Sequence, residues 1–273
     1  MEIPVRTAAA RLPALFLAAT LLTACADYAR AQNCSNDDFK GVYSAVVLGS
    51  FISIPGLPAG PTNRVGRVQV DGNGVSSITA TVSLFGVIAP ESYGGTYTIS
   101  SDCTASVILQ VPFPGVPAPI PLQFTGVLAS GGRTMNLILT NPQGTDLRIT
   151  LSKQRKPECS AADVIGDYAL SLAGTVINVF MVPPGYFARV GKVTFDGVGS
   201  FTASEHTSYA GFIAAEKLQG TYTVDATCVF KATSAPSSIT VSWYGVLSDT
   251  ISGMNLIDTS GGSVITGTLT SVY

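Results

Sequence analysis

The chain has 273 residues, enough for two domains, and its formal net charge is −2. Only 12% of the residues are charged, against roughly 25% in an average soluble domain, while 46% are hydrophobic. Such a chain can bury a core and is not disordered, and without a basic stripe it is not expected to bind nucleic acid.

The N-terminus has the pattern of an export signal, in which two arginines precede a short apolar segment over 12–24. That segment is shorter than the roughly 20 residues that span a bilayer. An A-x-A site would make 1–31 the signal peptide, whereas a lipobox ending at Cys25 would shorten it to 1–24 and leave Cys25 lipidated. Both alternatives predict a bacterial protein that is periplasmic, secreted or lipid-anchored, with membrane contact only through such an anchor.

The remaining chain is an internal repeat with an offset of 125 residues. The pattern C-S-x-x-D-x-x-G-x-Y begins at Cys34 and returns at Cys159. Further matches are R-V-G at 64–66 and 189–191, D-G-x-G at 71–74 and 196–199, and G-T-Y-T at 95–98 and 220–223. We therefore expect one domain over 32–152, a linker over 153–158 and a second domain over 159–273.

The four cysteines after Cys25 form one pair in each repeat, with the same spacing. Each unit should close on itself, and an exported chain meets an oxidising compartment. The repeat therefore predicts the disulfides Cys34–Cys103 and Cys159–Cys228 rather than free thiols or a metal site. In the loop-entropy model each bridge adds roughly 4 kcal/mol of stability.

Alternating apolar residues and turn signals divide each repeat into about eight short strands. In the first repeat we expect strands at 40–51, 63–71, 74–87, 91–100, 104–111, 120–129, 133–141 and 145–152. In the second we expect them at 166–177, 188–196, 199–209, 216–226, 228–234, 237–248, 252–259 and 262–271. An up-and-down barrel leaves no exposed sheet edge, so we predict an all-β protein of two tandem eight-stranded antiparallel up-and-down β-barrels. Two immunoglobulin-like β-sandwiches are the alternative fold.

The two ends of each predicted barrel differ. Tight turns and the cysteines belong to one end, and long apolar loops to the other. The expected loops are 52–62, 111–119, 178–187 and 209–215. A barrel with two such different ends resembles the calycins (lipocalin, avidin and fatty-acid-binding families). In place of the lipocalin G-x-W signature, the first strands have Gly41-Val42-Tyr43 and Gly166-Asp167-Tyr168. The resemblance implies a carrier of apolar ligands.

Strand parity points a set of aromatic side chains into each barrel. They are Tyr43, Tyr97 and Phe124 in the first repeat and Tyr168, Tyr222 and Trp243 in the second. These side chains either contact a ligand in a cavity or fill the core, since an eight-stranded barrel can be just wide enough for its own side chains.

Arg64 and Arg189 begin the second strand of each repeat, on the inward face at the loop-rich end. A guanidinium there could hold the carboxylate or phosphate of an amphipathic ligand. Alternatively, Glu91 and Glu216, which share that end and face, would neutralise the two arginines internally.

The sequence has no recognisable catalytic motif, and its single histidine, His206, is expected at the surface. We therefore expect neither an enzyme nor a cofactor or metal. The predicted function is an exported, non-enzymatic binding protein that takes a small apolar or amphipathic ligand at the barrel mouths. A cell-surface adhesion or assembly module that uses the apolar loops, and an outer-membrane barrel of sixteen strands, are the alternatives. The oligomeric state is not predicted.

Overall fold

A computed structural model describes residues 33–54, 56–113, 116–154, 156–235, 240–248 and 253–272. The predicted signal peptide and Cys25 lie outside these residues. Within the described part of the chain, no helix combines the length and the apolar character needed to cross a membrane.

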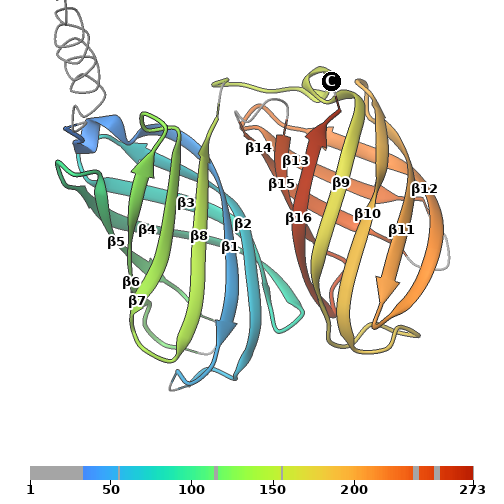
Figure 1. Ribbon diagram of the computed structural model, residues 1–273, viewed down its shortest axis with the longest axis horizontal. Helices are drawn as coiled ribbons and strands as arrows, with labels where there is room; N and C mark the ends of the chain where they lie inside the picture. Colours follow the sequence, from blue (N-terminus) through green and yellow to red (C-terminus); the bar gives the residue numbers. More distant parts are fainter. Residues whose placement is uncertain are drawn as a thin grey trace, which may run out of the picture. The chain divides into compact units, whose positions relative to one another are not determined.

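The strands form two closed antiparallel barrels in chain order (Figure 1). The first consists of β1 (Lys40–Phe51), β2 (Gly60–Asp71), β3 (Val75–Leu84), β4 (Val87–Ile99), β5 (Thr104–Val111), β6 (Ile120–Ala129), β7 (Thr134–Asn141) and β8 (Thr145–Lys153). The second consists of β9 (Ile165–Val176), β10 (Gly185–Asp196), β11 (Ser200–Tyr209), β12 (Phe212–Val224), β13 (Val229–Ser234), β14 (Ser242–Ser248), β15 (Gly253–Asp258) and β16 (Ser263–Ser271). Closure occurs where β1 pairs with β8 and β9 pairs with β16. The predicted fold class is thus confirmed. The strands form neither sandwiches nor a single barrel of sixteen strands.

One predicted loop is wrong. The sequence suggested a long connection over 209–215, but β11 and β12 are joined by Ala210 and Gly211 alone, with φ of 49° and 94°. Positive φ at both central residues is the geometry of a tight hairpin whose twist matches its strands. The prediction failed because Phe212 and Ile213 are both exposed, so the alternation that identifies a strand is absent there.

Both predicted disulfides are formed, with Cα–Cα distances of 5.0 Å for Cys34–Cys103 and 4.9 Å for Cys159–Cys228. Each joins the segment before the first strand of a barrel to the turn between its fourth and fifth strands. The disulfides therefore lie at the end of each barrel that also carries the tight D-G-x-G turn. We call this the closed end.

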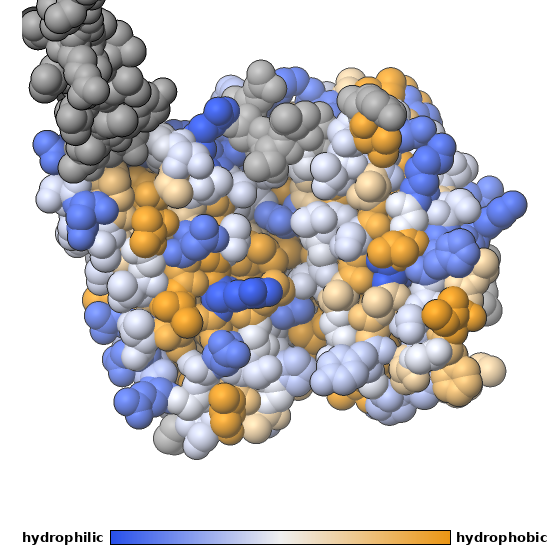
Figure 2. Space-filling view, in the orientation of Figure 1, coloured by the Kyte–Doolittle hydropathy of each residue, from blue (hydrophilic) through white to orange (hydrophobic). Residues whose placement is uncertain are grey.

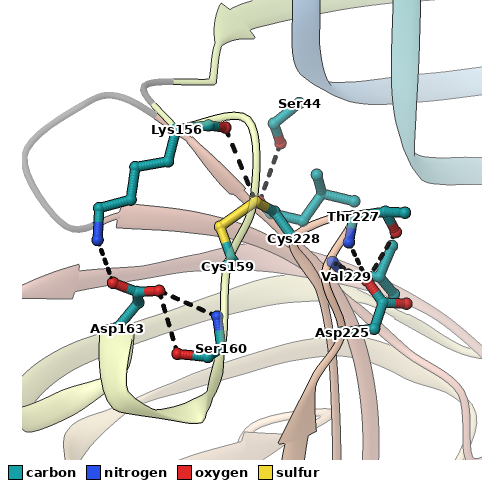
Figure 3. Close-up of a disulfide and its surroundings, with 10 residues drawn as sticks. Ser44, Lys156, Cys159, Ser160, Asp163, Asp225, Thr227, Cys228 and Val229 are labelled. Atoms are coloured by element: carbon teal, nitrogen blue, oxygen red, sulfur yellow. Dashed lines mark hydrogen bonds and ion pairs between the residues drawn. A yellow bond between two sulfur atoms is a disulfide. The ribbon is translucent and has the colours of Figure 1, made fainter.

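The repeated C-S-x-x-D pattern has a local structural cause. After each first cysteine a short 3-10 helix begins, η2 (Asn36–Asp38) or η3 (Ala161–Asp163). The backbone N–H of Ser35 donates to Asp38 Oδ2 at 2.8 Å, and that of Ser160 donates to Asp163 Oδ2 at 2.9 Å (Figure 3). This reciprocal serine–aspartate cap fixes the chain as it enters the barrel.

The two barrels contact each other through outward-facing side chains, within a single unit spanning Cys34–Tyr273. Val65 of β2 packs with Val246 and Ile257 of the second barrel, and all three are fully buried. Ser44 Oγ donates to the carbonyl of Val246 at 3.0 Å and lies beside the Cys159–Cys228 disulfide (Figure 3). Positions that parity places on the outside of each barrel are therefore buried between the barrels.

Candidate functional site

The predicted ligand-contacting aromatic residues lie in the barrel cores. Six of them are almost completely buried: Tyr43, Tyr97, Phe124, Tyr168, Tyr222 and Trp243. Three hydroxyls donate to backbone carbonyls, from Tyr43 to Gly132 at 2.6 Å, from Tyr97 to Phe39 at 3.1 Å and from Tyr222 to Val164 at 2.7 Å. These tyrosines tie turns and entry segments onto the closed ends.

The other three aromatic side chains pack among core residues. The Tyr168 ring lies 5.3 Å from that of Phe195, and the Trp243 ring lies 5.6 Å from that of Phe201. The interior of the first barrel has a cavity of about 40 Å³ lined mainly by apolar side chains. Pockets that enclose a drug-sized ligand measure roughly 300–1,000 Å³. The cavity in the first barrel is therefore smaller than such a pocket.

Arg64 is neutralised inside the first barrel. Its Nε donates to Glu91 Oε2 at 2.8 Å, and its second terminal nitrogen lies 3.5 Å from Glu91 Oε1. The remaining terminal nitrogen donates to Thr62 Oγ1 at 3.1 Å, and the guanidinium lies 5.7 Å from the centre of the Phe113 ring. Both charged side chains are buried. This pairing is the internal alternative that the sequence raised for Arg64.

Arg189 occupies the matching position in the second barrel but has more partners. One terminal nitrogen donates to Glu216 Oε2 at 2.8 Å and to the Tyr209 hydroxyl at 3.0 Å. Its Nε donates to Thr207 Oγ1 at 3.0 Å. The hydroxyls of Tyr209 and Thr207 also donate to Glu216, each at 3.1 Å. Arg189 and Glu216 therefore share a polar network that the first barrel does not repeat.

Glu205 is a buried carboxyl that sequence reasoning missed. Its Oε2 lies 3.7 Å from Arg189 Nε, the side chain is inaccessible to solvent, and neither oxygen accepts a hydrogen bond from the described residues. Burial raises the pKa of Glu205 to about 7, although the positive charge of Arg189 opposes that rise. At the matching position the first repeat has Ala80. The inward parity of Glu205 in its strand was the available signal.

The second barrel also holds a second acidic side chain with a raised pKa. Burial also raises the pKa of Asp258, which lies in β15. Asp258, Arg189 and Tyr209 line a small cavity of about 40 Å³ together with apolar side chains from the β9–β10 segment, including Val179 and Phe187. The second barrel thus has a small cavity with both apolar and charged lining residues at the end opposite its disulfide, which we call the loop end.

Large apolar side chains surround the loop end of the second barrel. Five of them are 73–87% exposed: Phe180, Met181, Tyr186, Phe212 and Ile213. Phe180 and Met181 form the tip of the β9–β10 loop, closed by a bridge between Val179 and Val182. The carbonyl of Tyr186 accepts a hydrogen bond from Ala210 N at 2.8 Å, which joins this loop to the β11–β12 hairpin. Figure 2 shows apolar side chains in orange at this lower edge of the second barrel. We call these five residues the apical patch.

His206 is exposed on β11, as expected. Among the described residues, no three His, Cys, Asp or Glu side chains are placed to hold a metal ion.

Comparison with known proteins finds no matching family model and no matching curated protein. Among solved structures, transferrin binding protein B from Neisseria meningitidis is 8% identical, with 86% of this chain and 76% of that chain covered and a TM-score of 0.32. A DUF3598-family protein of unknown function from Nostoc punctiforme is 12% identical, with 86% and 97% covered and a TM-score of 0.23. The fold assignment given above rests on the strand pairing of this chain.

Proposed function

We propose that this chain is an exported, non-enzymatic binding protein whose contact surface is the apical patch. The observation that supports this proposal is the exposure of Phe180, Met181, Tyr186, Phe212 and Ile213 at one end of the second barrel. Exposed apolar clusters on soluble proteins mark interaction sites, because they stabilise a complex by leaving water. The two disulfides support the export of the protein to an oxidising compartment.

The proposed partner is the apolar surface of another protein rather than a molecule enclosed by a barrel. The cavities of about 40 Å³ are too small to enclose a fatty acid. The exposed side chains include two phenylalanines and a tyrosine, and aromatic residues are enriched at the centres of protein interfaces. A flat or slightly hollow apolar surface on the partner would cover them.

The described residues of the first barrel do not repeat the apical patch. In the first barrel, Phe85 and Gly86 join β3 to β4 in the matching hairpin. The residue after that hairpin is Val87, whereas the second barrel has Phe212 in the matching place. The repeat has therefore diverged at the loop end, where the first copy has Pro61 and Val87 in place of Tyr186 and Phe212.

Site-specific photo-crosslinking in the producing bacterium tests the proposal. A photoreactive phenylalanine analogue at Tyr186 should give one discrete protein adduct, and the adduct should disappear when Phe180 and Phe212 are changed to serine. The control position is Ile165, an exposed apolar residue at the closed end of the same barrel. No adduct at position 186, or the same adducts from both positions, would contradict the proposal.

A small amphipathic ligand at the mouth of the second barrel is the second candidate. The observation in its favour is the cavity that is lined by apolar side chains together with Arg189 and Asp258. A short headgroup would enter this cavity while an acyl chain lay on the apical patch. Titration with a fluorescent fatty acid should then show saturable binding that Tyr186→Ser weakens. Absence of saturation would remove this candidate and leave the protein partner.

The site of signal cleavage remains a prediction. Mass spectrometry of the exported protein distinguishes the two expected N-termini, because cleavage before Gln32 leaves an unmodified chain and cleavage before Cys25 leaves an acylated one.

A further inference from the structure

The contact between the two barrels uses different surfaces on each barrel. The first barrel contributes the outer surface of β1–β3, which we call the leading face: Ser44, Asn63, Val65, Thr81 and Ser83. The second barrel contributes the outer surface of β14–β16, which we call the trailing face: Tyr244, Val246, Asn255, Ile257 and Thr266. The contact is therefore heterologous, in the sense that two unlike surfaces meet.

Because the barrels are copies of one another, each also carries the other type of face. On the second barrel, the residues that match the leading face are Ala169, Ala188, Val190, His206 and Ser208. On the first barrel, those that match the trailing face are Thr125, Val127, Asn136, Ile138 and Arg148. We propose that these two free faces bind each other between molecules, so that a second copy of this chain is the partner and the protein assembles head to tail.

The strand register establishes that the faces correspond. Asn136 pairs with Val127 on one side and Thr150 on the other, and Asn255 pairs in the same way with Val246 and Thr268. The carbonyl of Gly144 accepts hydrogen bonds from two successive N–H groups after β1, and that of Gly262 accepts the equivalent two after β9. The matching residues thus have the same place on each barrel surface.

The free faces expose the apolar residues that the internal contact buries. Val65 has no exposed surface, while its counterpart Val190 is 56% exposed. Val246 and Ile257 are also fully buried, and their counterparts Val127 and Ile138 are 53% and 57% exposed. Covering these three side chains by a second copy would remove apolar surface from water in the way the internal contact already does.

The free faces are also complementary in size. Inside the molecule, the large Tyr244 lies against the small Thr81, and in the free copies the small Thr125 would meet the large His206. Asn63 donates to Thr266 at 3.1 Å, and in the free copies Ala188 would meet Arg148. In both places a loss of volume on one face accompanies a gain on the other, which is expected of two surfaces that fit together.

Backbone contacts of the internal interface can form again between molecules. Gly262 N donates to the carbonyl of Gly86, and Ser83 Oγ donates to the carbonyl of Ser263. On the free faces, Gly144 matches Gly262, Gly211 matches Gly86 and Ser208 matches Ser83. Thr145 takes the place of Ser263. A heterologous contact that repeats the internal one leaves one free face at each end, so growth continues instead of stopping at a dimer.

Sedimentation velocity of the purified protein with both disulfides formed tests this assembly. We expect the weight-average mass to rise with concentration beyond twice the monomer mass. Val190→Asp removes one free face and Ile138→Asp removes the other, so each variant alone should remain monomeric. An equimolar mixture should form a 1:1 dimer and nothing larger, because only one intact pair of faces remains.

Val198→Asp is the matched control, since Val198 is exposed in the β10–β11 turn and belongs to neither face. It should assemble like the parent protein. Circular dichroism verifies that every variant is folded. A parent protein that stays monomeric at all concentrations, one that stops at a dimer, or a mixture of the two variants that stays monomeric would overturn the proposal.

Discussion

Replacing Glu205 by glutamine should remove a pH-dependent loss of stability from the second barrel. The carboxyl is buried and accepts no hydrogen bond from the described residues, and its pKa rises from 4.5 to about 7 on folding. Because the folded state holds this proton more tightly, the contribution of Glu205 to stability is fully present below pH 4.5 and is lost as the pH rises through 7. At about 1.4 kcal/mol for each unit of pKa, the loss amounts to about 3 kcal/mol.

Urea unfolding followed by tryptophan fluorescence measures this effect in the second barrel alone, because Trp243 is the only tryptophan and lies in that core. The free energy of unfolding of Glu205→Gln minus that of the parent protein should be about 3 kcal/mol larger at pH 8 than at pH 4.5. Glutamine has nearly the same shape, so packing changes should contribute equally at both pH values. The control is Glu158→Gln, which removes an exposed carboxylate before η3.

A constant difference between parent and variant across pH 4.5–8 would refute the reasoning, since it would mean that Glu205 has the same proton affinity in the folded and unfolded states. A loss of stability in the variant at pH 8 would refute it more directly. In that case the Glu205 carboxylate would stabilise Arg189 more than its burial costs.

Three further predictions follow from the packing of the barrels. Changing Arg64 alone to methionine should destabilise the first barrel by about 3–5 kcal/mol, because Glu91 is left as an unpaired buried charge. Changing both residues to apolar ones should destabilise it much less. Amide hydrogen exchange of β2–β4 measures both losses of stability, and equal losses would contradict the pairing argument. Replacing Cys159 and Cys228 by serine should lower the stability of the second barrel by about 2–5 kcal/mol in urea unfolding, and an unchanged midpoint would contradict a stabilising role for this bridge. Val65→Asp should separate the barrels by placing a charge in their apolar contact. Protease cleavage in the segment 153–158 should then become several-fold faster, while the tryptophan fluorescence of the second barrel stays unchanged. An unchanged cleavage rate would contradict this prediction.

Local patterns in the sequence were sufficient for the strands, the disulfides and much of the candidate site. Successive side chains of a strand point to opposite faces, so alternation identified which face of each strand is buried. The 125-residue offset then assigned each cysteine to its partner and matched Arg64 and Arg189 with Glu91 and Glu216. These features depend on residues within one repeat, so a comparison of the two repeats identifies them.

Strand parity also placed Glu205 inside the barrel, but the pattern could not predict the raised pKa of its carboxyl. The proton affinity of a buried carboxyl depends on the number of charges and hydrogen-bond donors around it. In the second barrel Glu205 and Glu216 lie near one guanidinium, and that count requires side chains from three strands. The nearly full interior is similarly a result of how side chains from opposite walls meet.

The sequence alone determined that this chain is a tandem repeat of disulfide-bonded barrels, because alternation, turns and cysteine spacing are properties of short segments. Only the tertiary structure decided which outward-facing residues are covered. Val65 and Val190 match in the repeat and share the same parity, yet the first is buried and the second is exposed. The physical reason is that burial on the outside of a barrel depends on the neighbouring barrel, and nothing within one repeat specifies which face that neighbour covers.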